Sequence, residues 1–153
     1  MFSKTLKALA IAATLAVPAV TGAYAYPHTV YQAQIDNQIN TVIAAARARG
    51  FNLLISNQRG QMYGQGSQVS FVVYLHAGAR YYIGGRCDSD CRDLDMVLRN
   101  ANGVELIADR DYDDVPGFTF NAPYTGNYIV TLELAHCRAY RCQVGAVVLG
   151  QTA

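Results

Sequence analysis

The chain contains no tryptophan, and its only two lysines, Lys4 and Lys7, both lie near its start. The 153 residues carry 12 basic and 11 acidic side chains, so the basic excess that nucleic-acid binding requires is missing. The lack of tryptophan lowers the expectation of a sugar-stacking platform. Motifs that cradle phosphates or dinucleotides are also absent, because the glycine-rich segment 63–66 precedes a strand pattern and not a helix pattern.

Long apolar segments are absent after residue 20. The one such run, from Ala8 to Val20, follows the two lysines and precedes Ala23 and Ala25, the small residues that signal peptidase requires. This run is too short to cross a bilayer. We therefore predict a signal peptide over residues 1–25 and export to the periplasm or the medium, and the alternative is an uncleaved anchor helix.

Four cysteines follow the leader, and an oxidising compartment favours disulfides between them. Three pairings are possible. We favour Cys87–Cys91 and Cys137–Cys142, because the second pair flanks a four-residue turn whose strand ends would bring the two Cβ atoms face to face. A zinc site is the alternative, for which the C-x3-C and C-x4-C spacings are loose.

The hydrophobic pattern changes period once, near residue 50. From Thr29 to Arg49 apolar residues recur at helical spacing, which predicts one amphipathic helix within a segment 26–50. Residues 51–153 then alternate with period two, apart from a polar stretch, 57–67, that predicts a loop or wide hairpin. We expect about seven or eight strands in a mainly β, antiparallel two-sheet sandwich. The clearest strand patterns are 69–75, 80–83, 94–98, 104–108, 118–120, 128–134 and 144–149.

One succession of motifs resembles a known family. An Asp-Leu-Asp strand follows Cys87 to Cys91, an acidic loop covers residues 108–116, and Ala122-Pro123 leads through Gly126 to Tyr128. In this order the motifs resemble the bacterial pre-peptidase C-terminal domain, over about residues 69–149. The resemblance implies a jelly-roll-like sandwich that accompanies secreted enzymes as a non-catalytic module, and some members resemble calcium-dependent binders of collagen or other polymers.

Nine of the 11 acidic residues fall between Asp88 and Asp114. So many carboxylates repel one another unless solvent or a cation compensates them, and calcium, which takes several oxygen ligands, would suit them. The alternative is that they form turns and accept backbone N–H bonds. The hypothesis is one calcium ion held by some of Asp109, Asp111, Asp113 and Asp114, with help from Asp88 or Asp90.

Tyrosine is frequent, with ten residues after the leader. Tyrosine side chains are rigid and amphipathic, so they suit a contact surface for a protein or a polysaccharide. Their high β-propensity is the alternative explanation. The candidates for a binding surface are Tyr81, Tyr112, Tyr124 and Tyr140, from a wider set that includes Tyr63 and Tyr74.

No catalytic residue is assigned. The serines after the leader lie in no nucleophile elbow, and both glutamates, Glu105 and Glu133, occupy outward strand positions. The sequence thus favours an exported, non-catalytic binding module, with calcium as its one candidate cofactor and a protein or polysaccharide as partner. Nucleic acid and a membrane span after cleavage are not expected. The alternatives are a small secreted metal-dependent hydrolase and a cell-envelope structural protein whose helix docks on a partner chain.

Overall fold

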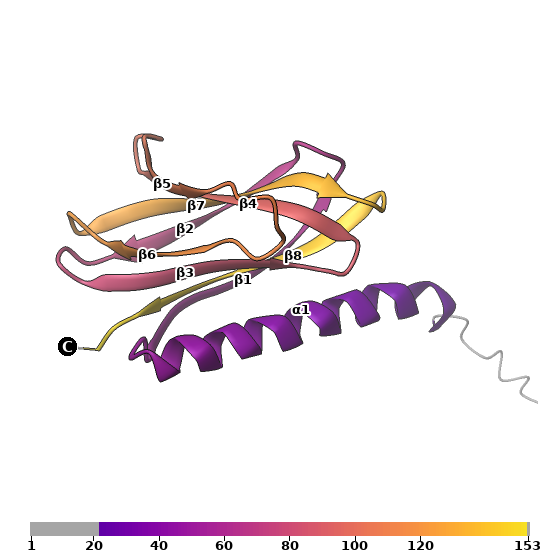
Figure 1. The fold of residues 1–153 in the computed structure, drawn as a ribbon, viewed down its shortest axis with the longest axis horizontal. Coiled ribbons are helices and arrows are strands. Elements are labelled where there is room, and N and C mark those ends of the chain that lie inside the picture. Colours follow the sequence, from indigo (N-terminus) through magenta and orange to yellow (C-terminus); the bar gives the residue numbers. More distant parts are fainter. Residues whose placement is uncertain (1–21, 153) are drawn as a thin grey trace, which may run out of the picture.

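The computed structural model describes residues 22–152, which form one helix and eight strands (Figure 1). The strands make two four-stranded antiparallel sheets, so the predicted mainly β sandwich is confirmed. Most of the predicted signal peptide lies outside the described residues, and its cleavage after Ala25 stays a prediction. The elements are α1 Gly22–Ala48, β1 Leu53–Tyr63, β2 Gln68–Leu75, β3 Arg80–Cys87, β4 Cys91–Asn100, β5 Glu105–Asp109, β6 Gly117–Asn121, β7 Gly126–Cys137 and β8 Arg141–Gly150.

The two sheets differ in what lies on their outer faces. One has the strand order β1-β8-β3-β6 and the other has the order β2-β7-β4-β5. Figure 1 shows α1 along the outer side of the first sheet and no helix along the outer side of the second. We call them the covered sheet and the open sheet. The main core lies between them and contains the side chains of Leu94, Met96 and Leu98, which face inward as their alternation predicts.

A second, smaller core fills the space between α1 and the covered sheet. Ile35 and Ile39 of α1 are fully buried there and share a cluster with Val147 and Leu149 of β8. The helix comes close because Gly145 has no side chain, and a Cβ at that position would lie 2.9 Å from Ile35 Cγ2. β8 is therefore buried on both faces, which explains its nearly continuous apolar sequence.

The outer face of the open sheet is built differently. On β2 the outward Val72 and Tyr74 are 66% and 55% exposed, while the inward Val73 and Leu75 are buried. Further along the face the Ser70 and Thr131 hydroxyl oxygens lie 2.9 Å apart across β2 and β7. Along β2 this is the polar-out, apolar-in alternation of a sheet with one face in water, whereas Thr131 on the neighbouring strand is buried.

The structure differs from the sequence-based expectations at two places. The helix begins at Gly22 and not at Thr29, and the polar segment expected as a loop belongs to the 11-residue strand β1. β1 pairs with β8 along its whole length. Backbone hydrogen bonds therefore make it a strand, although its sequence lacks alternating apolar residues. Its polar side chains also meet the helix, because Arg59 Nε donates to Asp36 Oδ1 at 2.9 Å.

Candidate binding site at the disulfide end

Two short turns at one end of the sandwich are each closed by a disulfide. Cys87–Cys91 spans the turn from β3 to β4, and Cys137–Cys142 spans the turn from β7 to β8. Both pairings are the predicted ones. Cys91 also pairs with Cys137 in the β4–β7 ladder, so the two turns lie side by side. We call residues 87–91 and 137–143 the clamped end.

Backbone hydrogen bonds join the two turns directly. The Arg138 N–H donates to the Asp90 carbonyl at 2.8 Å, and the Asp88 N–H donates to the Gln143 carbonyl at 3.0 Å. In return the Gln143 N–H donates to Asp88 Oδ2 at 2.6 Å. Each disulfide closes a loop of only a few residues, and such loops restrict the unfolded chain by about 2 kcal/mol each. The clamped end is thus a preorganised piece of surface.

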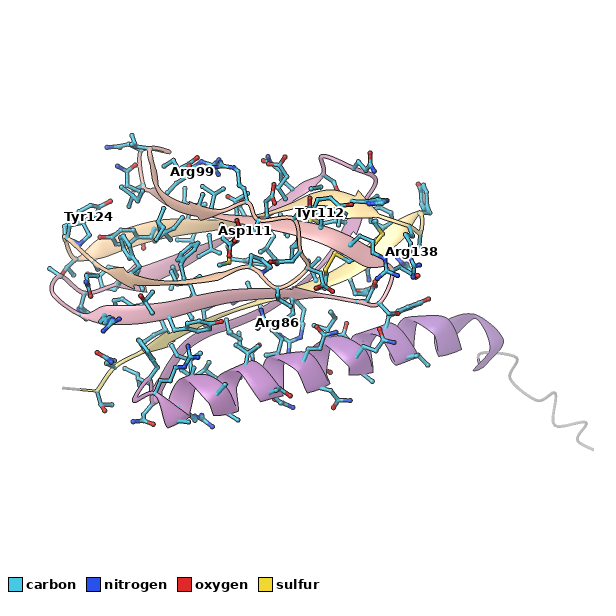
Figure 2. All side chains as sticks on the ribbon, in the orientation of Figure 1. Arg86, Arg99, Asp111, Tyr112, Tyr124 and Arg138 are labelled. Carbon is cyan, nitrogen blue, oxygen red and sulfur yellow. A yellow bond between two sulfur atoms is a disulfide. The ribbon has the colours of Figure 1, made fainter. Side chains whose placement is uncertain are left out.

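The helix contributes to the same end. Figure 1 shows the beginning of α1 beside the β7–β8 turn, and the Ser89 N–H donates to Gln34 Oε1 at 3.1 Å. Arg138 emerges at this end of the sandwich, whereas Tyr124 lies at the opposite end (Figure 2).

A cavity of about 240 Å³ opens between the helix and the two turns. It is smaller than the pockets of about 300–1,000 Å³ that enclose drug-sized ligands. The space therefore suits one ring or one side chain. Its lining comes from α1 (Tyr31), the first turn (Asp88, Asp90), the second turn (Ala139, Tyr140, Arg141) and β8 (Gln143).

The carboxylates of the cavity are held in unequal surroundings. Asp88 is 1% exposed; burial raises its pKa, the backbone N–H groups of Gln143 and Asp90 lower it, and the charge of Asp90 raises it again. The hydroxyl of Tyr31 hydrogen-bonds to Asp90, which raises the pKa of Tyr31. Asp88 thus closes the base of the cavity and Asp90 anchors the helix to its rim.

Gln143 is the unusual residue of this site. It is 3% exposed, and its side-chain Nε2 has no hydrogen-bond partner among the described residues. A buried N–H donor without an acceptor costs about 1–3 kcal/mol. Such groups are rare in folded proteins and call for an explanation.

Two exposed tyrosines stand at the rim. Tyr140 is 84% exposed and Tyr63 is 51% exposed. Their ring centroids lie 5.7 Å apart in an edge-to-face arrangement. Exposed aromatic rings beside a polar cavity are typical of recognition surfaces.

The acidic loop predicted to hold calcium uses its carboxylates differently. Asp109 accepts the N–H groups of Asp111 at 3.1 Å and Gly117 at 3.0 Å, and Asp113 accepts that of Val115 at 2.9 Å. These are the turn-forming bonds of the alternative interpretation. Asp88 and Asp90 lie at the clamped end, where Asp88 accepts two backbone N–H groups.

The fit of these acids to a metal ion is therefore poor. Within residues 22–152 no three histidine, cysteine or acidic side chains are disposed to hold a metal together. The contact between the acidic loop and the turn 87–91 is made by the backbone, with the Asp114 carbonyl 3.8 Å from the sulfur of Cys87. Among the described residues, Asp109, Asp111, Asp113 and Asp114 are not grouped with Asp88 or Asp90 in a way that could hold a metal ion.

The four candidate tyrosines do not share one surface. Tyr81 is 3% exposed, and its hydroxyl accepts the His76 N–H inside the sandwich, so its assignment to a binding surface was wrong. Tyr124 stacks on Tyr128 with ring centroids 4.8 Å apart, at the end far from Arg138 (Figure 2). Tyr112 is exposed on the loop after β5, and of the four only Tyr140 lines the cavity.

Sequence reasoning missed four residues that line this site: Tyr31, Ala139, Arg141 and Gln143. Tyr31 read as part of an amphipathic helix and Arg141 as part of a turn. A signal for Gln143 does exist, because it is the one polar side chain in the segment from Cys142 to Leu149. A polar residue in a strand buried on both faces needs a partner.

Comparisons with known proteins find only weak similarity. No family model and no curated protein matches the sequence. A periplasmic inhibitor of g-type lysozyme from Aeromonas hydrophila has a TM-score of 0.46 and 11% identity, covering 65% of this chain and 89% of that chain. A carbohydrate-binding domain of a xylanase from the hindgut metagenome of Trinervitermes trinervoides has a TM-score of 0.39 and 15% identity, covering 66% and 91%. These low scores carry no inference about a ligand.

Proposed function

We propose that this chain is an exported, non-catalytic binding module that contacts an extracytoplasmic protein or polysaccharide through its clamped end. The observation that carries the proposal is the cavity lined by Gln143, whose buried side-chain nitrogen has no hydrogen-bond partner among the described residues. A partner that accepts a hydrogen bond from this amide would recover the free energy that its burial costs.

The rigidity of the site supports binding. Both turns are closed by disulfides and hydrogen-bonded to each other, so little conformational entropy is lost when a partner docks. The exposed ring of Tyr140 adds apolar area next to the cavity. Rigid aromatic anchors of this kind dominate the energetics of many interfaces.

Export is supported by two features of the chain. The first 25 residues have the charge and apolar pattern of a signal peptide. All four cysteines are paired, as in proteins of oxidising compartments. No helix within residues 22–152 is long and apolar enough to span a membrane.

The family resemblance favours the same role. The order of the Asp-Leu-Asp strand, the acidic loop and the Ala-Pro segment resembles that of pre-peptidase C-terminal domains, which are non-catalytic. The calcium dependence of some of those domains is not part of this proposal, because Asp109 and Asp113 already accept backbone hydrogen bonds.

The test is capture of cell-envelope and culture-medium material by the immobilised, oxidised protein. Tyr140→Ala should abolish specific retention, because it removes an exposed ring and little else. The matched control is Tyr74→Ala, since Tyr74 is 55% exposed and pairs with Asn127 at the far end of β7. The control should retain the same material as the unmodified protein. Equal retention by both variants, or no specific retention at all, would contradict the proposal.

A further inference from the structure

We infer that the cavity of the clamped end binds one sugar ring of a neutral glycan, an inference that rests on the binding function proposed above. It starts from the hydrogen-bonding inventory of the cavity wall. Gln143 lines the cavity, and its buried Nε2 has no hydrogen-bond acceptor among the described residues. A ligand group that reaches this nitrogen must bring an acceptor, which excludes a bare ammonium or guanidinium group as the part that meets Gln143.

The aspartates of the cavity need hydrogen-bond donors from the ligand. Asp88 and Asp90 present carboxylates, which only accept hydrogen bonds, so the ligand must also bring donors. The Asp88 carboxylate is buried and already accepts the N–H groups of Asp90 and Gln143, so Asp90 at the rim is the carboxylate that a ligand meets. A hydroxyl is the small group that donates and accepts at once, and adjacent hydroxyls on a ring would meet both demands.

The charges around the cavity argue for a neutral ligand. Arg141 lines the cavity together with the two aspartates, and Arg138 is held beside it, with its Nη2 3.4 Å from the Ser89 carbonyl. Two positive and two negative side chains thus flank the site. Neither an anion nor a cation would gain a one-sided attraction, whereas dipolar hydroxyl groups lose nothing in a balanced field.

Size and aromatic lining point the same way. About 240 Å³ admits a single ring. Tyr31 and Tyr140 line the cavity, and Tyr63 contacts Tyr140 edge-on. A sugar ring has one face of C–H groups that packs against an aromatic ring while its hydroxyls face polar groups, so tyrosine serves here without tryptophan. Neighbouring sugars of a chain would run outward past the exposed Tyr140.

The test uses the oxidised protein and four neutral probes, the β-1,4-linked hexasaccharides of glucose, xylose, mannose and N-acetylglucosamine. Binding is measured by calorimetry and by nitrogen–proton NMR of the glutamine side-chain amides. At least one probe should bind and shift the side-chain amide signal of Gln143.

Gln143→Leu is the decisive variant, because it separates binding from folding. It should weaken binding at least about tenfold, which corresponds to about 1.4 kcal/mol. It should not lower the melting temperature, because the amide nitrogen that it removes has no partner to lose. If this variant fails to fold, Tyr140→Ala serves in its place and should weaken binding to a similar extent, while Tyr74→Ala should bind as the unmodified protein does.

Failure of this inference can be told apart from failure of the proposed function. If no hexasaccharide shifts the Gln143 signal, or if Gln143→Leu binds as tightly as the unmodified protein, the sugar assignment is overturned. Capture of envelope material that still depends on Tyr140 would then leave the binding function intact, with a peptide as the ligand. If no hexasaccharide binds and capture does not depend on Tyr140, both the sugar assignment and the proposed binding function are overturned.

Discussion

The outer faces of the two sheets carry different kinds of side chain. On the covered sheet, the outward side chains of β8 are apolar and pack under α1, with Gly145 allowing close approach. On the open sheet, the outward side chains of β4 include two aspartates, Asp93 and Asp95. The covered face thus contributes to stability through packing, whereas the open face keeps the sandwich in water and tolerates groups that packing would exclude.

The largest expected effect comes from breaking the covered face. Ile39→Ala should lower the free energy of unfolding by about 2–5 kcal/mol, because it removes a fully buried side chain of α1 and leaves a cavity above Gly145. The matched change on the open sheet, Val72→Ala, should alter it by no more than about 0.5 kcal/mol, since Val72 is 66% exposed. Denaturant unfolding of the oxidised proteins measures both. Similar losses for the two variants would show that the open face is covered in solution.

This contrast also explains what the sequence could predict. The apolar run of β8 reflects burial on both of its faces, and the alternation of β2 reflects burial on one face. The disulfide pairing followed from spacing in the same way. β1 was missed because it is an edge strand defined by backbone pairing to β8, and its polar side chains carry no strand signal.

The site was harder to predict than the fold, because its residues come from three distant segments. Tyr31, Asp90 and Gln143 belong to α1, the first turn and β8, and only the folded chain brings them together. Tyr81 was misassigned because alternation along a strand does not say which of its two sets of side chains faces the core. In the structure the set that contains Tyr81 faces the core. The clustering of aspartates in sequence indicated a metal, whereas in the structure Asp109 and Asp113 accept backbone N–H groups of their own loop and of the start of β6.

A smaller effect, of opposite sign, should come from the acids of the open face. Asp93 Oδ1 and Asp95 Oδ1 are buried, and neither has a hydrogen-bond partner among the described residues. Burial raises the pKa of both; the charge of Asp113 raises that of Asp93 further, and the charges of Asp93 and Glu133 raise that of Asp95. The folded state therefore binds protons more tightly than the unfolded chain, whose aspartates titrate near 3.8. Stability from this pair is present at acidic pH and is lost as the pH rises through the raised values.

Asp95→Asn should remove much of this pH dependence. The amide supplies a donor where two acceptors meet, so the variant should be more stable than the unmodified protein by about 1 kcal/mol near pH 8. The difference should shrink as the pH falls toward about 4, where the carboxyls of the unmodified protein take up protons. Asp111→Asn, which makes the same change of charge on an exposed loop, is the control and should not reproduce the gain in stability near pH 8. Parallel profiles for the Asp95 variant and the unmodified protein would contradict this account.

The smallest expected effect is that of calcium on the acidic loop beside the open sheet. The Asp113 carbonyl accepts the Leu94 N–H at 2.9 Å, so this loop is fixed to β4 by its backbone, and its carboxylates complete their own turns. The melting temperature in excess calcium should therefore equal that in excess chelator. An ion present at 100 times its Kd would add about 2.7 kcal/mol, a shift of several degrees that calorimetry detects easily. A shift that Asp109→Asn removes would contradict this expectation. It would mean that the hydrogen bonds of Asp109 open to bind the ion, and that the stability of the open sheet depends on a metal while that of the covered sheet does not.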